Sequence, residues 1–170
     1  MPCWRHQTPS EKRYPRGNQK LTKETCSTLP KIEIILCGNK VKKILFVCVE
    51  NAGRSQMAEA FANKYGKDKF IVSSAGNKPA DKVNPTVVEA LREKGIDISM
   101  SKPKRLTYQM AQDADLIVTM GCNDQGICPG PFFKPTIDWK LEDPKGKPIE
   151  KAREIRDEIE RRVKELIEAS

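Results

Sequence analysis

From Lys42 onward, short runs of apolar residues alternate along the chain with segments whose apolar residues recur at helical spacing. A continuous apolar run of a few residues is typical of a strand buried on both faces. The alternation of strand and helix favours a parallel sheet with right-handed crossovers and helices on both faces. We therefore expect an α/β fold of three layers, α/β/α, around a four-stranded parallel sheet. The predicted strands are Lys43–Cys48, Phe70–Ala75, Asp115–Met120 and Thr136–Trp139.

The predicted helices carry recognisable start and stop signals. Asn84 followed by Pro85 is typical of a helix N-cap and first helical position, and Gly95 supplies an end to that helix. The last helix has an apolar face, and charged pairs four residues apart, Glu158–Arg162 and Glu160–Lys164, support its outer face. The predicted helices are Ser55–Tyr65, the segment that begins at Pro85, Thr107–Asp113 and Ile149–Ala169, and residues 121–135 are expected to form a loop.

The first 40 residues differ in composition from the rest of the chain. They hold four prolines and eight Lys/Arg against three acidic residues, whereas residues 41–170 carry a net charge of only +3. We expect residues 1–40 to be a disordered basic extension and residues 41–170 to be one catalytic domain. Translation starting near Val41 would make the extension an artefact of the start site. Cys3, Cys26, Cys37 and His6 lie in the extension, but none of their spacings is the C-x2–4-C pair of a metal site.

The composition excludes several classes of protein. Most of the net charge of +8 lies in the extension, and no basic face with a nucleic-acid-binding module is visible, so we expect no nucleic-acid partner. The longest apolar run, Ile44–Val49, has six residues, far short of the roughly 18 that a membrane helix needs. Without a signal peptide either, we expect a cytoplasmic monomer with no membrane partner. In that compartment, six cysteines favour catalytic, redox or metal chemistry over a disulfide framework.

The segment between the first strand and the first helix has the composition of an anion-binding loop. It begins with Cys48 at the strand end and reaches Arg54 where the helix starts. A tight loop at a helix N-terminus can turn backbone N–H groups toward an anion, and arginine adds a planar fork that matches two oxygens of a tetrahedral oxyanion. The candidate oxyanion-binding residues are Val49, Glu50, Asn51, Ala52, Gly53, Arg54 and Ser55.

Cys48 is the candidate nucleophile. Amide dipoles, the Arg54 guanidinium and the Ser55 hydroxyl would all stabilise a thiolate at the floor of this loop. The alternative is a buried structural cysteine beside a surface arginine. A cysteine at a strand end, with an arginine six residues on and a helix following, favours catalysis. Cys122 follows the third predicted strand, so a parallel sheet would bring it to the same edge as Cys48.

Together these residues resemble the signature of the low-molecular-weight protein tyrosine phosphatase superfamily, C-x5-R-[ST]. Within that superfamily, residues 42–169 look most like the thioredoxin-coupled arsenate reductases. The matching stretches are ILFVCVENAGRSQMAEAF (44–61), SSAGNKPADKVNPTVVEAL (73–91), DLIVTMGC (115–122) and DWKLEDP (138–144). Residues 1–40 lie outside the resemblance.

The resemblance implies a phosphatase-like fold and a reaction carried by cysteines. Cys48 would attack arsenate, and Asp143 of the Asp-Pro motif would protonate the leaving oxygen. Cys122 would then attack Cys48 and release arsenite, and Cys128 would attack Cys122 to leave a disulfide that thioredoxin reduces. The implied ligand is arsenate or a phosphate-like oxyanion, and the implied donor and partner is reduced thioredoxin. No metal and no bound cofactor are implied.

Several of these assignments have alternatives. Five residues separate Cys122 from Cys128, one fewer than is usual in the reductases it resembles, and the two could be structural thiols near a loop. A zinc site would lack further ligands in the domain unless the nucleophilic cysteine joined it. Asp143 could merely open a turn, since Asp-Pro is a common turn sequence, and Asp138 and Glu142 lie nearby.

Three functions therefore stay open at the level of sequence. The first is arsenate reduction driven by thioredoxin. The second is hydrolysis of phosphomonoesters such as phosphotyrosine. Tyrosine phosphatases of this fold usually carry aromatic residues after the Asp-Pro motif, whereas Lys145-Gly146-Lys147 stands here, which favours a small anion with residual phosphatase activity. The third is a non-catalytic oxyanion-binding module, which the presence of Cys48, Arg54 and Asp143 disfavours.

Overall fold

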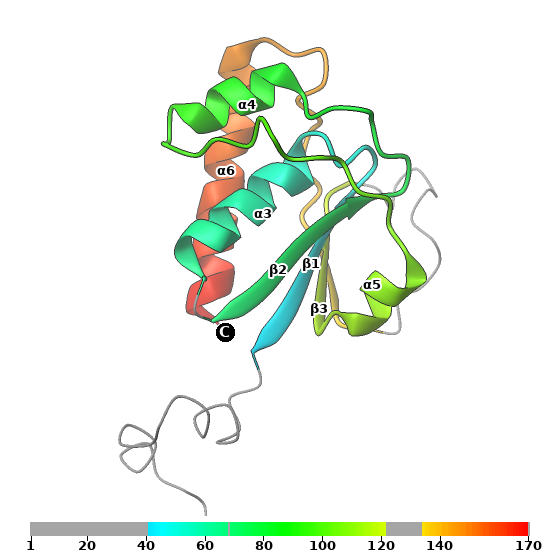
Figure 1. The fold of residues 1–170 in the computed structure, drawn as a ribbon. Coiled ribbons are helices and arrows are strands. Elements are labelled where there is room, and N and C mark those ends of the chain that lie inside the picture. Colours follow the sequence, from blue (N-terminus) through cyan, green and yellow to red (C-terminus); the bar gives the residue numbers. More distant parts are fainter. Residues whose placement is uncertain (1–40, 68, 122–133, 170) are drawn as a thin grey trace, which may run out of the picture. The chain divides into compact units, whose positions relative to one another are not determined.

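The computed structural model describes residues 41–67, 69–121 and 134–169. Within these ranges, strands and helices follow one another in the order that the sequence predicted (Figure 1). The strands are β1 (Lys42–Cys48), β2 (Phe70–Gly76), β3 (Leu116–Thr119) and β4 (Thr136–Asp138), and the helices are α3 (Arg54–Tyr65), α4 (Pro85–Arg92), α5 (Tyr108–Asp113) and α6 (Ile149–Glu168). The predicted extension 1–40 and most of the predicted loop 121–135 lie outside the described residues. None of the helices described has the length and hydrophobicity to cross a membrane.

The sheet is parallel throughout and has the strand order β2-β1-β3-β4. The register places Cys48, the last residue of β1, opposite Gly76 of β2, and Val47 opposite Thr119 of β3. Because parallel strands end at the same edge of a sheet, the residues after β1, β2 and β3 meet there. The predicted four-stranded parallel α/β architecture is confirmed.

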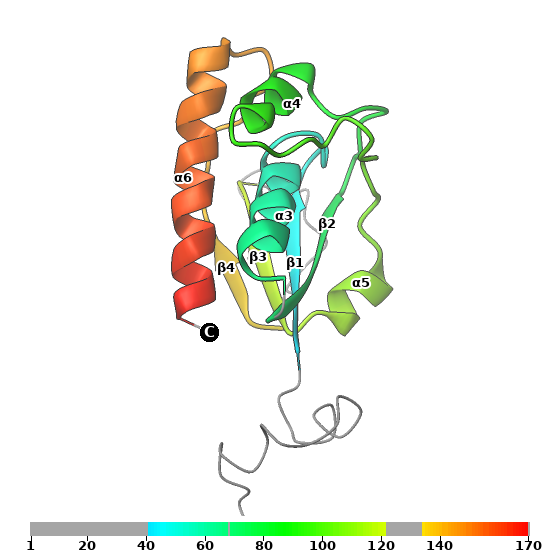
Figure 2. The same ribbon diagram turned by 60° about the vertical axis from the view of Figure 1, so that its left-hand side comes forward.

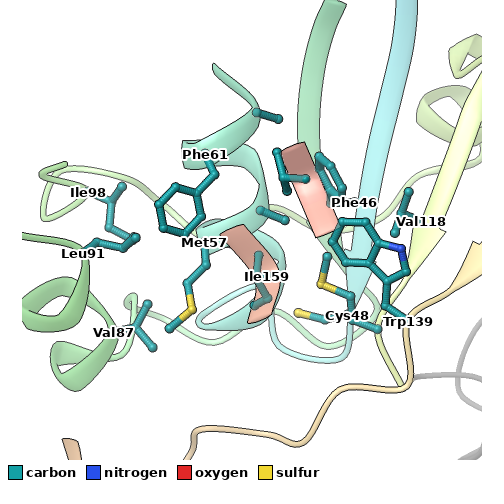
Figure 3. Close-up of a cluster of buried hydrophobic side chains, with 14 of the residues drawn as sticks. Phe46, Cys48, Met57, Phe61, Val87, Leu91, Ile98, Val118, Trp139 and Ile159 are labelled. Carbon is teal, nitrogen blue, oxygen red and sulfur yellow. The ribbon is translucent and has the colours of Figure 1, made fainter. Parts of the chain in front are cut away.

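Helices cover both faces of the sheet, as expected for three layers. Figures 1 and 2 show α3, α4 and α6 on one face and α5 on the other. The side chains of β1 alternate between the two faces: Ile44, Phe46 and Cys48 belong to the larger apolar core, and Leu45 and Val47 belong to the smaller one. This alternation follows from the two-residue period of a strand. Figure 3 shows Cys48 on the larger core's side, together with Phe46 and Trp139.

The helix ends differ slightly from the predictions. The side chain of Asn84 caps α4 by accepting a hydrogen bond from the backbone N–H of Thr86 at 3.0 Å, as predicted for an N-cap. That helix ends at Arg92 rather than at Gly95, because a further turn follows in which Gly95 has a φ of +72°. The strands β3 and β4 are each shorter than the predicted apolar runs.

Helix α6 packs its apolar stripe against α3 and α4. The two predicted charged pairs form, with 2.6 Å between Arg162 and Glu158 and 2.8 Å between Lys164 and Glu160. Glu160 does not lie on the outer face as expected. It is only 9% exposed, because the hydroxyl of Tyr65 and the ammonium group of Lys94 also bind its carboxylate.

Candidate functional site

The Cys48 thiol lies at the floor of the loop that joins β1 to α3. Cys48 is only 3% exposed, and α3 begins six residues later with the buried Arg54. The loop is anchored along its length to the segment that follows β2. Three backbone hydrogen bonds of 2.9 Å make this connection. The N–H of Lys78 donates to the carbonyl of Val49, that of Ala80 to Glu50, and that of Asn84 to Ala52. The sequence placed the loop correctly, and the start of the helix falls one residue earlier than predicted.

Two polar groups of the loop and helix contact the sulfur. The backbone N–H of Asn51 donates to Cys48 Sγ at 3.2 Å, and the Ser55 hydroxyl lies 3.0 Å from the same sulfur. The loop and the first turn of α3 therefore hold the Cys48 sulfur in place through two polar contacts.

Asn51 organises this loop in a way that sequence reasoning did not foresee. Its backbone has a φ of +50°, in the left-handed region that asparagine tolerates better than most residues. Its amide nitrogen donates to the hydroxyls of Ser55 and Ser74, both at 2.8 Å, and its amide oxygen accepts from the Gln56 side chain and from the backbone N–H of Lys104. The completely buried Asn51 side chain thereby connects the loop to α3, β2 and the segment after α4.

Gly76 allows the loop to lie directly against β2. A Cβ at this position would stand 2.7 Å from the Asn51 backbone nitrogen and 2.7 Å from the Val49 carbonyl oxygen. Both are backbone atoms of the loop, so neither could move aside without moving the loop itself. A glycine at the end of β2 is therefore required by the close approach of two chain segments.

Arg54 connects the loop to the segment that carries the Asp-Pro motif. Its Nη2 donates to Asp143 Oδ2 at 2.6 Å, and its Nη1 donates to the Leu141 carbonyl at 2.8 Å. Arg54 is buried, whereas the side chain of Asp143 is 47% exposed. Of the three acids near the motif, Asp143 is therefore the one in contact with the arginine of the loop.

The other two acids have different partners. Asp138 accepts hydrogen bonds from the backbone N–H groups of Gly121 and Lys140, both at 3.3 Å. Glu142 pairs with Lys147, and the hydrogen bond from this lysine lowers the pKa of the Glu142 carboxyl. Neither acid lines the cavity that Cys48 and Arg54 share.

Cys48, Arg54 and Asp143 line one cavity of about 480 Å³. Its walls also include Glu50, Ala52 and Gly53 of the loop, and its rim includes Lys82 and Lys145. A buried thiol, a guanidinium and the N-terminus of a helix line this cavity together, a set of groups that suits a tetrahedral oxyanion. Among the described residues, no group of three or more His, Cys, Asp or Glu side chains could hold a metal ion.

Cys122 and Cys128 lie outside the described residues. Gly121, which precedes Cys122 in the sequence, does lie beside the site: a Cβ at Gly121 would stand 3.0 Å from Arg54 Nη1. Gly121 has a φ of +69°, so a side chain would be disfavoured there on backbone grounds as well. The described chain thus approaches the cavity one residue before Cys122.

Comparison with known proteins identifies the family. The model of the low molecular weight phosphotyrosine protein phosphatase family matches residues 43–170. The chain belongs to this family. An arsenate reductase of Brevibacillus brevis is 40% identical over 128 residues, which cover 75% of this chain and 95% of that protein.

Solved structures of proteins with two different activities share the fold. A thioredoxin-dependent arsenate reductase of Corynebacterium glutamicum is 41% identical with a TM-score of 0.64, and the match covers 76% of this chain and 61% of that one. An arginine phosphatase of Geobacillus stearothermophilus is 28% identical with a TM-score of 0.67, covering 75% of this chain and 92% of that one. The family fold therefore serves both a reduction and a hydrolysis, and the residues around the cysteine must decide between them.

Proposed function

We propose that this protein reduces arsenate to arsenite, with Cys48 as the nucleophile. The observation that carries the proposal is the convergence of Cys48, Arg54 and Asp143 on one cavity, in a chain 40% identical to an arsenate reductase. Arsenate is a tetrahedral oxyanion, and the loop of residues 49–55 would hold its oxygens with backbone N–H groups and the Arg54 fork.

In the first step, the Cys48 thiolate attacks arsenic. A sulfur–arsenic bond forms and one arsenic–oxygen bond breaks. Asp143, in its protonated form, would give a proton to the departing oxygen so that it leaves as water. The contact with Arg54 holds the Asp143 carboxyl beside the group that would bind the anion. Because an arginine favours the ionised carboxylate, Asp143 would take up its proton only once the bound anion occupies Arg54.

In the second step, the cysteines supply the two electrons. The Cys122 thiolate attacks the Cys48 sulfur, a disulfide forms, and the electron pair of the sulfur–arsenic bond stays on arsenic, which leaves as arsenite. The Cys128 thiolate then attacks Cys122 and frees the Cys48 thiolate. The resulting Cys122–Cys128 disulfide would be reduced by the dithiol of thioredoxin, which is the proposed partner.

This chemistry needs only residues 41–170, which we propose to be the catalytic domain. Every proposed catalytic group lies in this range, and so does the whole match to the family. Residues 1–40 are proposed to be a basic extension without a part in the reaction.

The decisive experiment supplies purified protein with arsenate, thioredoxin, thioredoxin reductase and NADPH. We expect NADPH oxidation that depends on arsenate and is lost in Cys48→Ser, because a neutral hydroxyl is a poor nucleophile in this loop. The matched control is Ser73→Ala, on β2 and outside the cavity lining. Full activity of Cys48→Ser would contradict the proposal.

Single-turnover measurements separate the two later cysteines. In Cys128→Ser, Cys48 and Cys122 still supply two electrons, so we expect about one arsenite per enzyme and then a stop. In Cys122→Ser, the arsenic adduct lacks its attacking thiol, and even the first arsenite should fail to appear. Normal multiple turnover of Cys128→Ser with thioredoxin would mean that thioredoxin or a small thiol attacks the Cys48–Cys122 bond directly.

Hydrolysis of phosphomonoesters is the second candidate function. The specific observation in its favour is that the cysteine, arginine and acid that a phosphatase of this family needs occupy one cavity. Turnover of an aryl phosphate without any arsenate-dependent NADPH oxidation would support this function in place of reduction.

A further inference from the structure

One carboxylate oxygen joins two segments that are distant in the sequence. Asp138 Oδ1 accepts hydrogen bonds from the backbone N–H groups of Gly121 and Lys140, each at 3.3 Å. Both donors have a left-handed backbone, with a φ of +69° at Gly121 and +43° at Lys140. Asp138 therefore connects the chain just beyond β3 with the turn just beyond β4.

The turn beyond β4 has a fixed starting point and an unusual backbone. The N–H of Trp139 donates to the Thr119 carbonyl at 2.9 Å, and the Trp139 ring packs beside Phe46 with 5.7 Å between ring centroids (Figure 3). The next residue, Lys140, adopts a conformation that residues with a Cβ disfavour. The bond from its N–H to Asp138 stabilises this conformation and so determines where the chain goes after Lys140.

Both segments that Asp138 joins lie beside the guanidinium of Arg54. The carbonyl of Leu141, the residue after Lys140, accepts from Arg54 Nη1 at 2.8 Å. Gly121 lies against this same hydrogen bond, because a Cβ there would stand 3.0 Å from Arg54 Nη1 and 3.4 Å from the Leu141 carbonyl oxygen. The position of the Nη1 end of Arg54 thus depends on the two backbones that Asp138 holds.

Asp138 would act on a bound anion only indirectly. It is absent from the lining of the cavity that contains Cys48 and Arg54. The guanidinium of Arg54 is a rigid planar group, so fixing one end of it determines the direction of all its N–H groups. A displaced Leu141 carbonyl would therefore turn the whole group away from the direction that an oxyanion requires.

We propose that Asp138 is a positioning residue for Arg54. Its oxygen holds the Gly121 and Leu141 backbones in place, and these set the direction in which Arg54 presents its N–H groups to the anion. The inference rests on the oxyanion-binding step of the proposed function. Asp138 contributes an acceptor oxygen to this arrangement, and its negative charge is not required.

The test separates the acceptor oxygen from the charge by measuring the binding of inorganic phosphate with isothermal titration calorimetry. Asp138→Ala loses both hydrogen bonds, and we expect the dissociation constant of phosphate to rise about tenfold. In Asp138→Asn the amide oxygen can still accept both bonds, so the affinity should stay within about twofold of the wild type. If the carboxylate acted through its charge, both variants would bind phosphate more tightly, and the proposal would be wrong.

A spectroscopic measurement shows whether the effect passes through Arg54. In 15N-labelled protein, the side-chain N–H signals of Arg54 are identified by their absence in Arg54→Lys. These signals should move in Asp138→Ala and stay in place in Asp138→Asn. Weaker phosphate binding in Asp138→Ala with unmoved Arg54 signals would overturn the positioning role, and so would lost binding in a folded Asp138→Asn.

The matched control is Asp113→Ala on α5, which removes a carboxylate that accepts from Gln109 and does not line the cavity. Its phosphate affinity should equal that of the wild type. An unchanged phosphate affinity in Asp138→Ala would refute the positioning role and leave the proposed reaction standing. The expected binding pattern in a protein that makes no arsenite would refute the reaction and leave the positioning role standing.

Discussion

A buried asparagine with all of its side-chain hydrogen-bonding groups engaged sets the shape of the oxyanion loop. Asn51 combines a left-handed backbone with contacts to two hydroxyls, an amide and a backbone N–H. Replacement by alanine would leave these partners unsatisfied and would place alanine in a backbone conformation that it disfavours. The geometry around the Cys48 sulfur depends on that backbone, because the Asn51 N–H is one of its donors.

We expect Asn51→Ala to lower the free energy of unfolding by about 3 kcal/mol, the cost of losing several buried hydrogen bonds. Urea denaturation monitored by circular dichroism measures this. Asn63→Ala on the exposed face of α3 is the matched control and should change stability by less than about 0.5 kcal/mol. Similar unfolding midpoints for the two variants would show that the Asn51 network is not a stabilising element.

No other cationic side chain should replace Arg54 without loss of activity. A lysine has one ammonium group and cannot reproduce the two directed bonds to Leu141 and Asp143 or the fork toward an anion. We expect Arg54→Lys to reduce kcat/KM for arsenate on the order of a hundredfold, as for the loss of a transition-state donor. Arg92→Lys, exposed on α4, should retain wild-type activity. A twofold or smaller effect of Arg54→Lys would contradict the assigned role.

The sequence predicted the groups of one short motif, and the family resemblance added Asp143, but the partners of the Asn51 side chain were missed. Cys48, Arg54 and Ser55 could be predicted because they lie within eight consecutive residues at a strand-to-helix junction. Ser74 lies 23 residues from Asn51, and their contact depends on the pairing of β1 with β2. No local pattern reveals such a contact, because a serine in a strand has many possible partners.

At the level of elements, the close contact between β2 and the oxyanion loop has a direct test. Gly76→Ala would bring a methyl group within 2.7 Å of two backbone atoms of the loop, so the loop must shift away. We expect most reductase activity to be lost while the circular dichroism spectrum stays native. Gly95→Asn is the control, since that position has open space and a positive φ that asparagine accepts. Equal activity of both variants would disprove the steric argument.

The packing of α6 against its neighbours adds a dependence of stability on pH. Burial raises the pKa of Glu160, but hydrogen bonds from Lys164, Tyr65 and Lys94 outweigh it and hold the pKa at about 2. Hydrogen bonds from Arg153 and then Arg156 likewise hold the pKa of Glu93 at about 2.

A pKa below the ordinary value of 4.5 means that folding favours the charged form of Glu160. The contribution of this carboxylate to the free energy of unfolding is therefore complete above about pH 4.5. It is lost as the pH falls toward 2. We expect the urea midpoint of the wild type to fall steeply between pH 4.5 and pH 2. The midpoint of the Glu160→Gln variant should fall less steeply over the same interval. Identical slopes for wild type and variant would contradict the assignment to Glu160.

The order of the elements could be predicted far better than their ends or the partners of their charged residues. Apolar runs and glycine and proline signals located each strand and helix between residues 42 and 169. The burial of Glu160 could not be predicted, because Tyr65 and Lys94 come from α3 and the turn after α4. An i,i+4 pair with Lys164 is equally compatible with an exposed helix face.

For the whole molecule, the match to the family covers residues 43–170 and leaves out residues 1–40. Removal of residues 1–40 should therefore leave the melting temperature within about 2 °C and kcat/KM unchanged, while lowering the net charge from +8 to +3. Differential scanning calorimetry and the coupled arsenate assay measure both. A large loss of melting temperature in the truncated protein would show that the extension packs against the domain.

The two-sided strand β1 has a consequence for how the protein can adapt to new substrates. Its side chains are shared between two cores on opposite faces of the sheet, and its last residue is the proposed nucleophile Cys48. A mutation that displaced the backbone of β1 would disturb both cores at once, whereas changes of the exposed side chains of Asp143 and Lys145 would disturb neither. Substitutions at these exposed positions can therefore reshape the mouth of the cavity while the two cores keep Cys48 in place.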